Sequence, residues 1–286
     1  MNSEKHPYVT CEDYTVSNQK FDLLYNAQYS MLETFPKPTG EELASYYESS
    51  DYISHTDSKE TLTDKLYQTI KRVALKNKLN LLNSFQTEEK KVLDVGCGTG
   101  EFLLTCKNNG WNVVGVEPNK NARELAISKL NENNAPKIVS ELQDISLQQF
   151  DVITLWHVLE HVPDLNSYIY KLKSLLKPNG VLVIAVPNYK SYDAVYYKQF
   201  WAAFDVPRHL WHFSKKSIQL IFSEFDMKVE TTLPMKFDSF YVSLLSEKYK
   251  TGKSNFIKAF FIGFVSNLKA LSSKEYSSLI YILKNI

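Results

Sequence analysis

The sequence is poor in cysteine, balanced in charge and without a long apolar run. Its three cysteines, Cys11, Cys97 and Cys106, are too few for a disulfide framework, which favours a reducing cytoplasm. The 33 basic and 32 acidic residues give a net charge of +1, which excludes long-range attraction to nucleic acid or to an anionic membrane but leaves room for a local basic patch. The most apolar run, 259–265, is far shorter than the roughly 18 residues of a membrane span, and residues 1–30 contain no apolar signal core. We therefore expect a cytoplasmic protein with no nucleic-acid partner and no stable membrane insertion.

The most informative segment is the run Val-Leu-Asp-Val-Gly-Cys-Gly-Thr-Gly at residues 92–100. An apolar stretch is followed there by glycines at every second position, and then by the helix-like segment 101–108. A second apolar stretch, 111–116, ends in Glu117, about 20 residues after Gly96. Strand, glycine loop, helix, strand and acid form the first half of a nucleotide-binding βαβ unit. Glu117 would accept hydrogen bonds from the two hydroxyls of a ribose.

The glycine spacing and a second acid indicate which nucleotide binds. Gly96, Gly98 and Gly100 do not fit the Gly-x-Gly-x-x-Gly pattern of dinucleotide sites, which disfavours a nicotinamide-dependent oxidoreductase. Asp94 would repel a pyrophosphate, but it suits a ligand that carries an ammonium and a sulfonium. That ligand is S-adenosylmethionine. The alternative, a tight glycine turn with no ligand, leaves Glu117 unexplained.

Two later motifs extend the pattern. Residues 150–162 read as a buried strand that runs into a turn with Leu-Glu-His-Val at 159–162, and Pro-Arg-His-Leu stands at 207–210. With these motifs the chain, over roughly residues 60–286, resembles the class I S-adenosylmethionine-dependent methyltransferases, most closely a bacterial branch. The resemblance implies an α/β fold with a doubly wound, mostly parallel, Rossmann-like sheet of seven strands. It implies a cofactor but specifies no acceptor.

The expected organisation is a short segment, 1–57, followed by a methyltransferase domain, 58–286. In relatives the first region often holds a cysteine-based zinc knuckle, but Cys11 stands alone here, so we expect no zinc. Thr39 begins a predicted capping box and a short helix through Ser49. Apolar residues at helical spacing predict one long helix over 59–85. A further helix is expected from Ser214 to Phe225, and strands are expected near 91–95, 112–116, 137–140, 151–155, 181–186, 227–232 and 279–283.

An insertion of about 238–275 precedes the last predicted strand. Its apolar residues recur at helical spacing in two groups, which predicts a pair of helices. One interpretation is a helical pair packed on the body of the protein. The other is a lid over an apolar substrate, or a patch that makes peripheral contact with a membrane surface.

The resemblance assigns a cofactor site to the ends of the strands. The glycines would surround the methionine part of the cofactor, Asp94 would lie near its ammonium, and Glu117 would hold the ribose. Pro118 and Asn119 would border the adenine, with Glu141 and Leu142 against its edge. The complete expected set is Asp94, Gly96, Cys97, Gly98, Gly100, Glu117, Pro118, Asn119, Glu141, Leu142, Trp156 and His157.

His157, Glu160 and His161 allow three interpretations. They match an inverted zinc-protease motif, which needs a helix and further ligands. Related quinone-pathway O-methyltransferases carry an acid followed by Glu-His here and bind a divalent metal, but the first position in this chain is His157. The third interpretation, which we favour, is that Glu160 and His161 order the loop while His157 faces the cofactor. We therefore expect no metal.

The catalytic candidates are His157, Arg208, His209 and His212. The last three lie in an aromatic-rich loop, 201–213, which in this fold leaves the strand ends where the acceptor binds. Arg208 could grip a carboxylate or phosphate, and His209 or His212 could be a base. The competing interpretation is an aromatic corner with satisfied histidines.

These residues predict methyl transfer to an oxygen or nitrogen of a small molecule. By resemblance, the acceptor would be a sugar, a lipid or a secondary metabolite. No Asn-Pro-Pro-Tyr or Asp-Pro-Pro-Tyr tetrapeptide follows the fourth strand, which argues against methylation of adenine in nucleic acid. The alternative is a non-catalytic partner subunit that binds S-adenosylmethionine. The sequence leaves the oligomeric state open.

Overall fold

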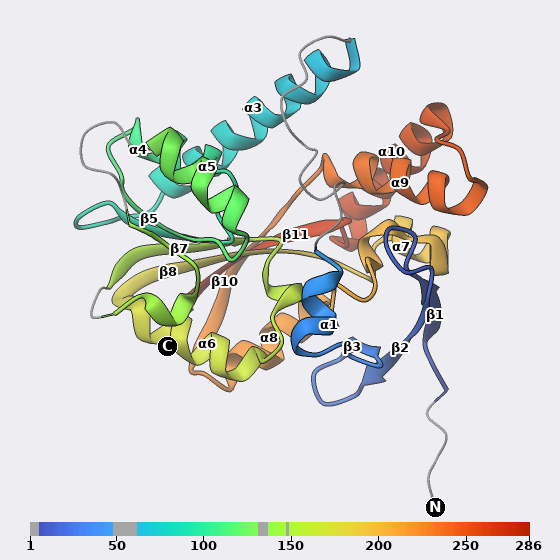
Figure 1. Cartoon of the computed structure of the whole chain (residues 1–286), viewed down its shortest axis with the longest axis horizontal. Coiled ribbons are helices and arrows are strands. Elements are labelled where there is room, and N and C mark those ends of the chain that lie inside the picture. Colours follow the sequence, from blue (N-terminus) through green and yellow to red (C-terminus); the bar gives the residue numbers. More distant parts are fainter. Residues whose placement is uncertain (1–5, 48–61, 131–136, 147–148) are drawn as a thin grey trace, which may run out of the picture.

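Two sheets, one large and mostly parallel and one small and antiparallel, contain the strands of the part of the chain that the structure describes (Figure 1). The computed structural model describes residues 6–47, 62–130, 137–146 and 149–286. The expected boundary near residue 57 lies outside the described residues, so the division of the chain at that point stays a prediction.

The large sheet has seven strands in the order β10-β11-β8-β7-β4-β5-β6. Strand β11 is antiparallel to both of its neighbours, whereas the other neighbouring pairs are parallel. This arrangement confirms the predicted doubly wound α/β fold. Its strands are β4 (Lys91–Val95), β5 (Asn112–Val116), β6 (Ile138–Val139), β7 (Phe150–Trp156), β8 (Leu176–Pro187), β10 (Met227–Pro234) and β11 (Ser278–Asn285).

Helices cover both faces of the large sheet (Figure 1). The central strands carry continuous apolar runs, and Leu93, Ile153 and Val183 are completely buried, as in parallel sheets that are covered on two sides. One face is covered by α3 (Leu62–Asn83), α4 (Glu101–Lys107) and α5 (Lys120–Leu130), and the other by α6 (Leu165–Leu175) and α8 (Lys215–Ser223). The long helix predicted over 59–85 is α3. Ser214 begins α8 as predicted, since its side chain accepts the backbone N–H of Ser217.

Residues 9–35 form three strands that the sequence analysis missed. The small sheet has the order β1-β2-β3-β9 and is antiparallel. It joins β1 (Val9–Glu12), β2 (Lys20–Asn26) and β3 (Met31–Phe35) to β9 (Trp211–His212). Helix α1 (Gly40–Ser45) follows, but the predicted capping box is wrong, because the Thr39 side chain makes no cap hydrogen bond. Ser49, the predicted end of this helix, lies outside the described residues.

The insertion before β11 is a pair of helices, α9 (Asp238–Thr251) and α10 (Phe256–Ser273), as expected. The two helices pack against one another beside α7 (Tyr192–Tyr197). Among the described residues, no helix is both long and apolar enough to cross a membrane. Short 3-10 turns complete the fold at η1 (Leu142–Asp144), η2 (Leu159–His161), η3 (Lys198–Phe200) and η4 (Ala202–Phe204).

Candidate active site

The glycine loop lies between β4 and α4, at the carboxyl ends of the parallel strands, where ligands bind in this class of fold. Gly96, Gly98 and Gly100 all have positive φ angles, of 72°, 55° and 78°. A Cβ at position 96 would lie 2.5 Å from Val158 Cγ2, and one at position 100 would lie 2.9 Å from the Cβ of Ala126. A Cβ at position 98 would meet nothing within 4 Å. The first and third glycines thus allow close packing, whereas the middle one faces open space.

Glu117, at the end of β5, is bound to this loop. One of its carboxylate oxygens accepts the Gly98 N–H at 2.8 Å, and the other accepts the Asn119 N–H at 2.9 Å. Burial raises the pKa of Glu117, although these two backbone hydrogen bonds oppose the shift. The strand-end acid and the open glycine are therefore in direct contact.

Asp94 lies on β4, almost completely buried. Its carboxylate accepts a 2.6 Å hydrogen bond from Thr154 Oγ1 on the neighbouring β7. Burial raises the pKa of Asp94 to about 7, although this hydrogen bond and the charge of Lys78 oppose the rise. Lys78 comes from α3, and its Nζ lies 4.2 Å from the ring centroid of Trp156. A buried acid with a raised pKa would gain from a cationic ligand.

The residues expected around the adenine occupy different environments. The Asn119 side chain accepts the Ala122 N–H and so begins α5, while the carbonyl of Pro118 accepts from Arg123. Glu141 is exposed and caps η1, whereas Leu142 is buried in the core. Cys97 is also buried, and burial raises the pKa of its thiol, so we expect this residue to pack rather than react.

Trp156 ends β7, and His157 follows it. The Trp156 ring meets Phe102 edge to face at 5.7 Å, and its Nε1 has no hydrogen-bond partner among the described residues. His157 has a positive φ of 58°. Its Nδ1 lies 3.3 Å from Glu160, and its Nε2 lies 3.2 Å from Asp238, the first residue of α9. Burial disfavours the charged ring, but the two carboxylates outweigh it and raise the pKa of His157 to about 10. The side chain is therefore an imidazolium near neutral pH and is not a free base there.

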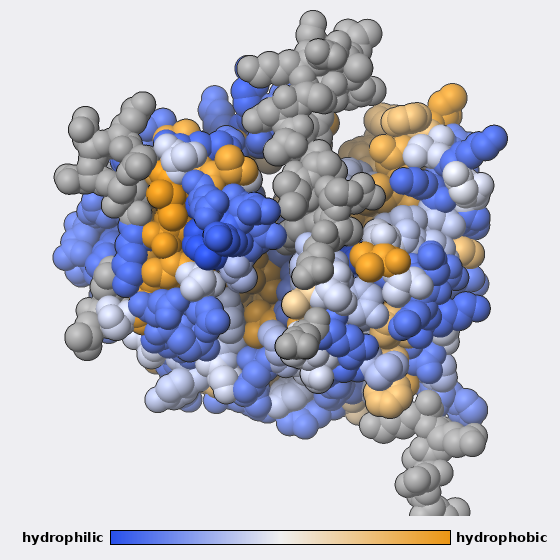
Figure 2. Space-filling model, viewed as in Figure 1, coloured by the Kyte–Doolittle hydropathy of each residue, from blue (hydrophilic) through white to orange (hydrophobic). Residues whose placement is uncertain are grey.

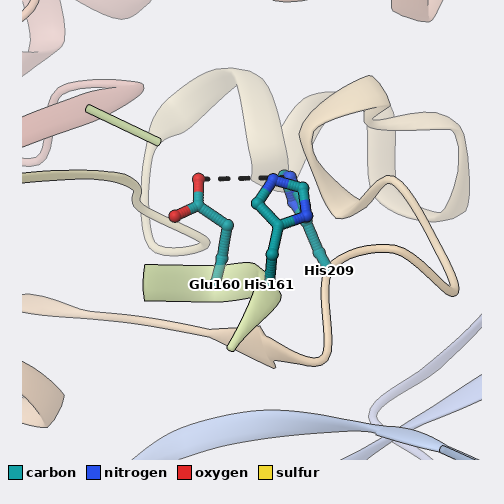
Figure 3. Close-up of side chains that lie close together, drawn as sticks. All are labelled: Glu160, His161 and His209. Atoms are coloured by element: carbon teal, nitrogen blue, oxygen red, sulfur yellow. Dashed lines mark ion pairs between the residues drawn. The ribbon is translucent and has the colours of Figure 1, made fainter. Parts of the chain in front are cut away.

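Glu160, His161 and His209 point toward one another across two loops (Figure 3). One nitrogen or oxygen atom of each lies within 4.8 Å of the other two, and His209 Nε2 lies 4.0 Å from Glu160. His209 Nδ1 contacts the Ala203 carbonyl at 2.9 Å, and His161 Nδ1 contacts the Arg208 carbonyl at 3.1 Å. Because a carbonyl can only accept, His209 Nδ1 carries the proton in its contact, and the lone pair of a neutral His209 ring lies on Nε2. His161 Nδ1 also lies 2.9 Å from the Tyr47 hydroxyl, which can donate or accept, so its contacts are compatible with either tautomer.

The negative charge of Glu160 in this cluster is partly balanced by the neighbouring His157. Burial opposes ionisation of Glu160, but the ion pair with His157 outweighs it and lowers the pKa. Both Glu160 carboxylate oxygens are nevertheless without a hydrogen-bond partner among the described residues. Burial also lowers the pKa of His161 to about 4, so that ring is neutral near pH 7. The cluster thus turns one carboxylate and two imidazole rings toward a common point.

Arg208 is buried and committed to acids of its own chain. Its Nε donates to Asp205 at 3.0 Å, a second nitrogen also binds Asp205, and Asp13 lies 3.8 Å away. Burial disfavours its charge, but Asp205 outweighs it and raises the pKa of Arg208 further. In this structure the guanidinium ties the loop 201–213 to the first segment of the chain, and a role of Arg208 in binding an anionic acceptor stays a prediction.

His212 lies in β9 and is also a structural residue. Its Nε2 is 3.0 Å from Thr34 Oγ1, and the Thr34 hydroxyl donates to the His209 carbonyl at 2.6 Å. The hydroxyl proton is used in that contact, so the His212 nitrogen is the donor to Thr34. Burial lowers the pKa of His212 well below its ordinary value. Of the two histidines considered as a base, only His209 turns a lone pair toward the cluster.

The sequence analysis missed Lys78, Thr154, Asp205 and Asp238. Thr154 lies in the fourth strand of the predicted sheet, and its register with β4 could have identified it as a partner of Asp94. Asp205 stands in the loop 201–213 that the sequence analysis singled out, although no role was assigned to it, whereas Lys78 and Asp238 approach from α3 and α9, where no local pattern marks them.

Comparison with known proteins places this architecture in a family. A family model described as a methyltransferase domain matches residues 66–232, more than half of the chain. A ubiquinone biosynthesis O-methyltransferase from Histophilus somni is 38% identical over 112 residues, covering 35% of this chain and 46% of the relative. The same enzyme from Erwinia tasmaniensis is 38% identical over 107 residues, covering 36% of this chain and 44% of the relative. The chain thus spans less than half of the length of these curated relatives.

Solved structures show the same fold at low identity. Magnesium protoporphyrin IX methyltransferase from Synechocystis PCC 6803 with bound SAH has a TM-score of 0.55 at 16% identity, covering 84% of this chain and 97% of that one. A cyclopropane synthase from Mycobacterium tuberculosis has a TM-score of 0.54 at 16% identity, covering 87% and 99%. Because the matched domain spans most of the large sheet, the chain belongs to the methyltransferase-domain family.

Proposed function

We propose that this protein transfers a methyl group from S-adenosylmethionine to an oxygen or nitrogen of a small molecule. The observation that carries the proposal is the contact between Glu117 and the open glycine of the loop, Gly98. A strand-end acid beside open backbone fits a ribose, and buried Asp94 fits an ammonium, so the residues present suit this cofactor. The expected bacterial branch, with Leu-Glu-His-Val at 159–162 and Pro-Arg-His-Leu at 207–210, stays a prediction.

The names of the relatives favour oxygen as the methylated atom, since they are O-methyltransferases.

When bound, S-adenosylmethionine supplies an activated methyl group at its sulfonium. The protein then has to orient the cofactor, exclude water and remove a proton from the acceptor. Asp94 and Glu117 orient the cofactor, and His209 Nε2 accepts the acceptor's hydroxyl proton. His157, as an imidazolium, holds Glu160 and α9 in place. Sugar, lipid and secondary-metabolite hydroxyls are the acceptor classes that we propose.

The test is methyl transfer by the purified chain to a panel of hydroxylated acceptors, followed by detection of S-adenosylhomocysteine. Release that depends on an acceptor and is lost in Glu117→Ala supports the proposal. Tight binding of S-adenosylhomocysteine without turnover on any acceptor favours the alternative, a non-catalytic partner subunit that binds the cofactor.

One observation favours a second candidate, metal-assisted methyl transfer. Glu160, His161 and His209 turn a carboxylate and two imidazole rings toward one point, and His209 Nδ1 donates to the Ala203 carbonyl, as in metal-ligating histidines. A divalent ion there would act as a Lewis acid on the acceptor hydroxyl. His157 would not be a ligand, because both of its nitrogens face carboxylates. The first proposal requires no metal.

Calorimetric titration with Mg²⁺, Mn²⁺ and Zn²⁺ separates the two candidates. Binding that is lost in Glu160→Gln, together with chelator-sensitive turnover, would establish the metal-assisted reaction. Full turnover in the presence of a chelator would leave the first proposal. The cytoplasmic location stays part of the proposal, and the three buried free cysteines are compatible with it.

A further inference from the structure

Helix α10 turns a continuous apolar face to solvent. Ile257 is 85% exposed and Phe261 is 62% exposed, although both are large apolar residues. The α10 face consists of Ile257, Phe260, Phe261, Phe264, Leu268 and Leu271, all of which are exposed. Figure 2 shows apolar side chains at the upper right of the molecule, where Figure 1 places α9 and α10. Exposed apolar patches of this kind mark interaction surfaces in folded proteins.

The opposite side of α10 is firmly anchored, so the exposed face does not result from loose packing. Ser266 Oγ donates to the buried carboxylate of Asp193 at 2.6 Å. Ser239 Oγ, on α9, donates to the Gly263 carbonyl at 3.1 Å. A Cβ at position 263 would lie only 2.8 Å from the Phe240 ring, which shows how closely the helices approach. The fold therefore holds the α10 face outward.

The segment that contains α9 and α10 carries more positive than negative side chains. Residues 236–275 contain seven lysines and three acids, a net charge of +4 in a chain whose total is +1. All three acids are paired within the protein: Glu247 is buried against Lys258, Asp238 pairs with His157 and Glu275 pairs with Lys215. The remaining lysines of the segment are exposed: Lys236, Lys248, Lys250, Lys253, Lys269 and Lys274.

This charge distribution decides between two occupants of the face. A second copy of the chain would bring lysines against lysines, with no exposed acid in the segment to compensate. An anionic lipid surface would attract the same lysines and would accept the phenylalanines among its acyl chains. The small net charge of the whole chain does not oppose this, because screening limits the interaction to nearby groups.

We propose that the α10 face docks peripherally on an anionic lipid surface, with the helix lying in the plane of the interface and its lysines against the headgroups. Such binding needs no membrane-spanning helix. Helix α9 connects this surface to the candidate active site, because its first residue, Asp238, contacts His157. The docking proposal stands on the α9–α10 pair and does not depend on methyl transfer.

The test is co-sedimentation of the full chain with vesicles of phosphatidylcholine alone or mixed with phosphatidylglycerol. The wild type should sediment with the anionic vesicles, less with the neutral ones, and less as salt is added. Ile257→Glu and Phe261→Glu should each weaken binding by roughly tenfold or more, because a carboxylate would enter the apolar interface. Tyr170→Glu, at a 71% exposed position on α6, is the matched control and should bind like the wild type.

Three outcomes would overturn the proposal. The wild type could stay in the supernatant with both kinds of vesicle, or Ile257→Glu and Phe261→Glu could sediment as well as the wild type. The protein could also be a dimer by analytical ultracentrifugation that Phe261→Glu converts to a monomer, without vesicle binding, which would assign the face to a second copy. Because these side chains are exposed, the variants should fold, and circular dichroism checks that they do.

Discussion

His157 Nε2 lies 3.2 Å from a carboxylate oxygen of Asp238, and this ion pair joins the end of β7 to the start of the inserted helix α9. The two residues are far apart in the sequence and come from elements with different roles. With Glu160 on its other nitrogen, the imidazole is clamped between two acids. The contact connects the candidate active site to the α9–α10 pair.

We predict that Asp238→Asn destabilises the protein in a pH-dependent way. The pKa of His157 is raised from its ordinary 6.5 to about 10, so the stabilisation is complete below pH 6.5 and is lost as the pH rises through 10. Because the pair is partly exposed, the loss at pH 6 should be only about 1 kcal/mol. Urea unfolding of both proteins at pH 6, 8 and 10 measures it. Asp226→Asn, at an exposed ion pair, is the control. A difference that is as large at pH 10 as at pH 6 would contradict the assignment.

Affinity for S-adenosylhomocysteine should rise with pH through the titration of Asp94. Its pKa is raised to about 7, and only its carboxylate form attracts an ammonium. Calorimetry at pH 6, 7 and 8 should show progressively tighter binding by the wild type. Asp94→Asn should bind roughly tenfold or more weakly and lose this trend, since an ion pair is replaced by a neutral contact. The same trend in the variant would assign the titration to another group.

The first and middle glycines of the loop should respond differently to alanine. Both have positive φ, so each substitution costs about 1 kcal/mol in backbone strain. Gly96→Ala also forces a methyl group against Val158 and should cost about 1–3 kcal/mol more in unfolding free energy. Gly98→Ala meets open space and should keep most of its stability but weaken binding of S-adenosylhomocysteine. Equal unfolding free energies of the two variants would refute the distinction.

His209→Ala should lower turnover, whereas His212→Ala should lower the free energy of unfolding. His209→Ala removes the proposed base and should lower turnover by about 10²- to 10⁴-fold with little change in cofactor affinity. His212→Ala leaves the buried Thr34 hydroxyl without its donor and should cost about 1–3 kcal/mol of unfolding free energy. Turnover, calorimetry and urea unfolding of both variants provide the comparison. A fully active His209→Ala would return that residue to a structural role.

Arg208→Ala should fail by unfolding and not by losing an acceptor. Removing the guanidinium leaves Asp205 and Asp13 without their cation, and breaking a buried pair costs about 3–5 kcal/mol. Urea unfolding should show this loss. At a temperature where the variant stays folded, its KM for any acceptor found should change little. A large rise in KM with unchanged stability would restore Arg208 as an acceptor ligand.

The large sheet was predictable because its signals are local. Lys91–Val95 and Asn112–Val116 are largely buried runs that end in a turn or an acid, and these two strands begin and end at the predicted residues, whereas β8 begins five residues before its prediction. In the small sheet, β1, β2 and β3 pair as local hairpins that the sequence analysis overlooked, and only the pairing of β3 with β9 is distant in sequence. Its last strand, Trp211–His212, has only two residues and lies far along the chain from its partner, Met31–Phe35. No sequence window contains both.

The same contrast holds for the candidate site. Asp94 and Glu117 stand at strand ends, so the topology alone brings them to the glycine loop. The partners of the histidines could not be predicted, because Asp238 arrives on an inserted helix and Thr34 on a distant strand. These partners decide which histidine is charged, which is a donor and which is left with a lone pair.

Calorimetric titration of the purified chain with S-adenosylhomocysteine, with NADH as the control ligand and Glu117→Ala as the control protein, tests the central claim most directly. Micromolar binding of S-adenosylhomocysteine by the wild type, no heat with NADH, and a loss of binding in Glu117→Ala is the result that we predict. No heat of binding with either ligand, or equal binding of S-adenosylhomocysteine by Glu117→Ala and the wild type, would contradict the assignment of the glycine loop and its acids as the cofactor site.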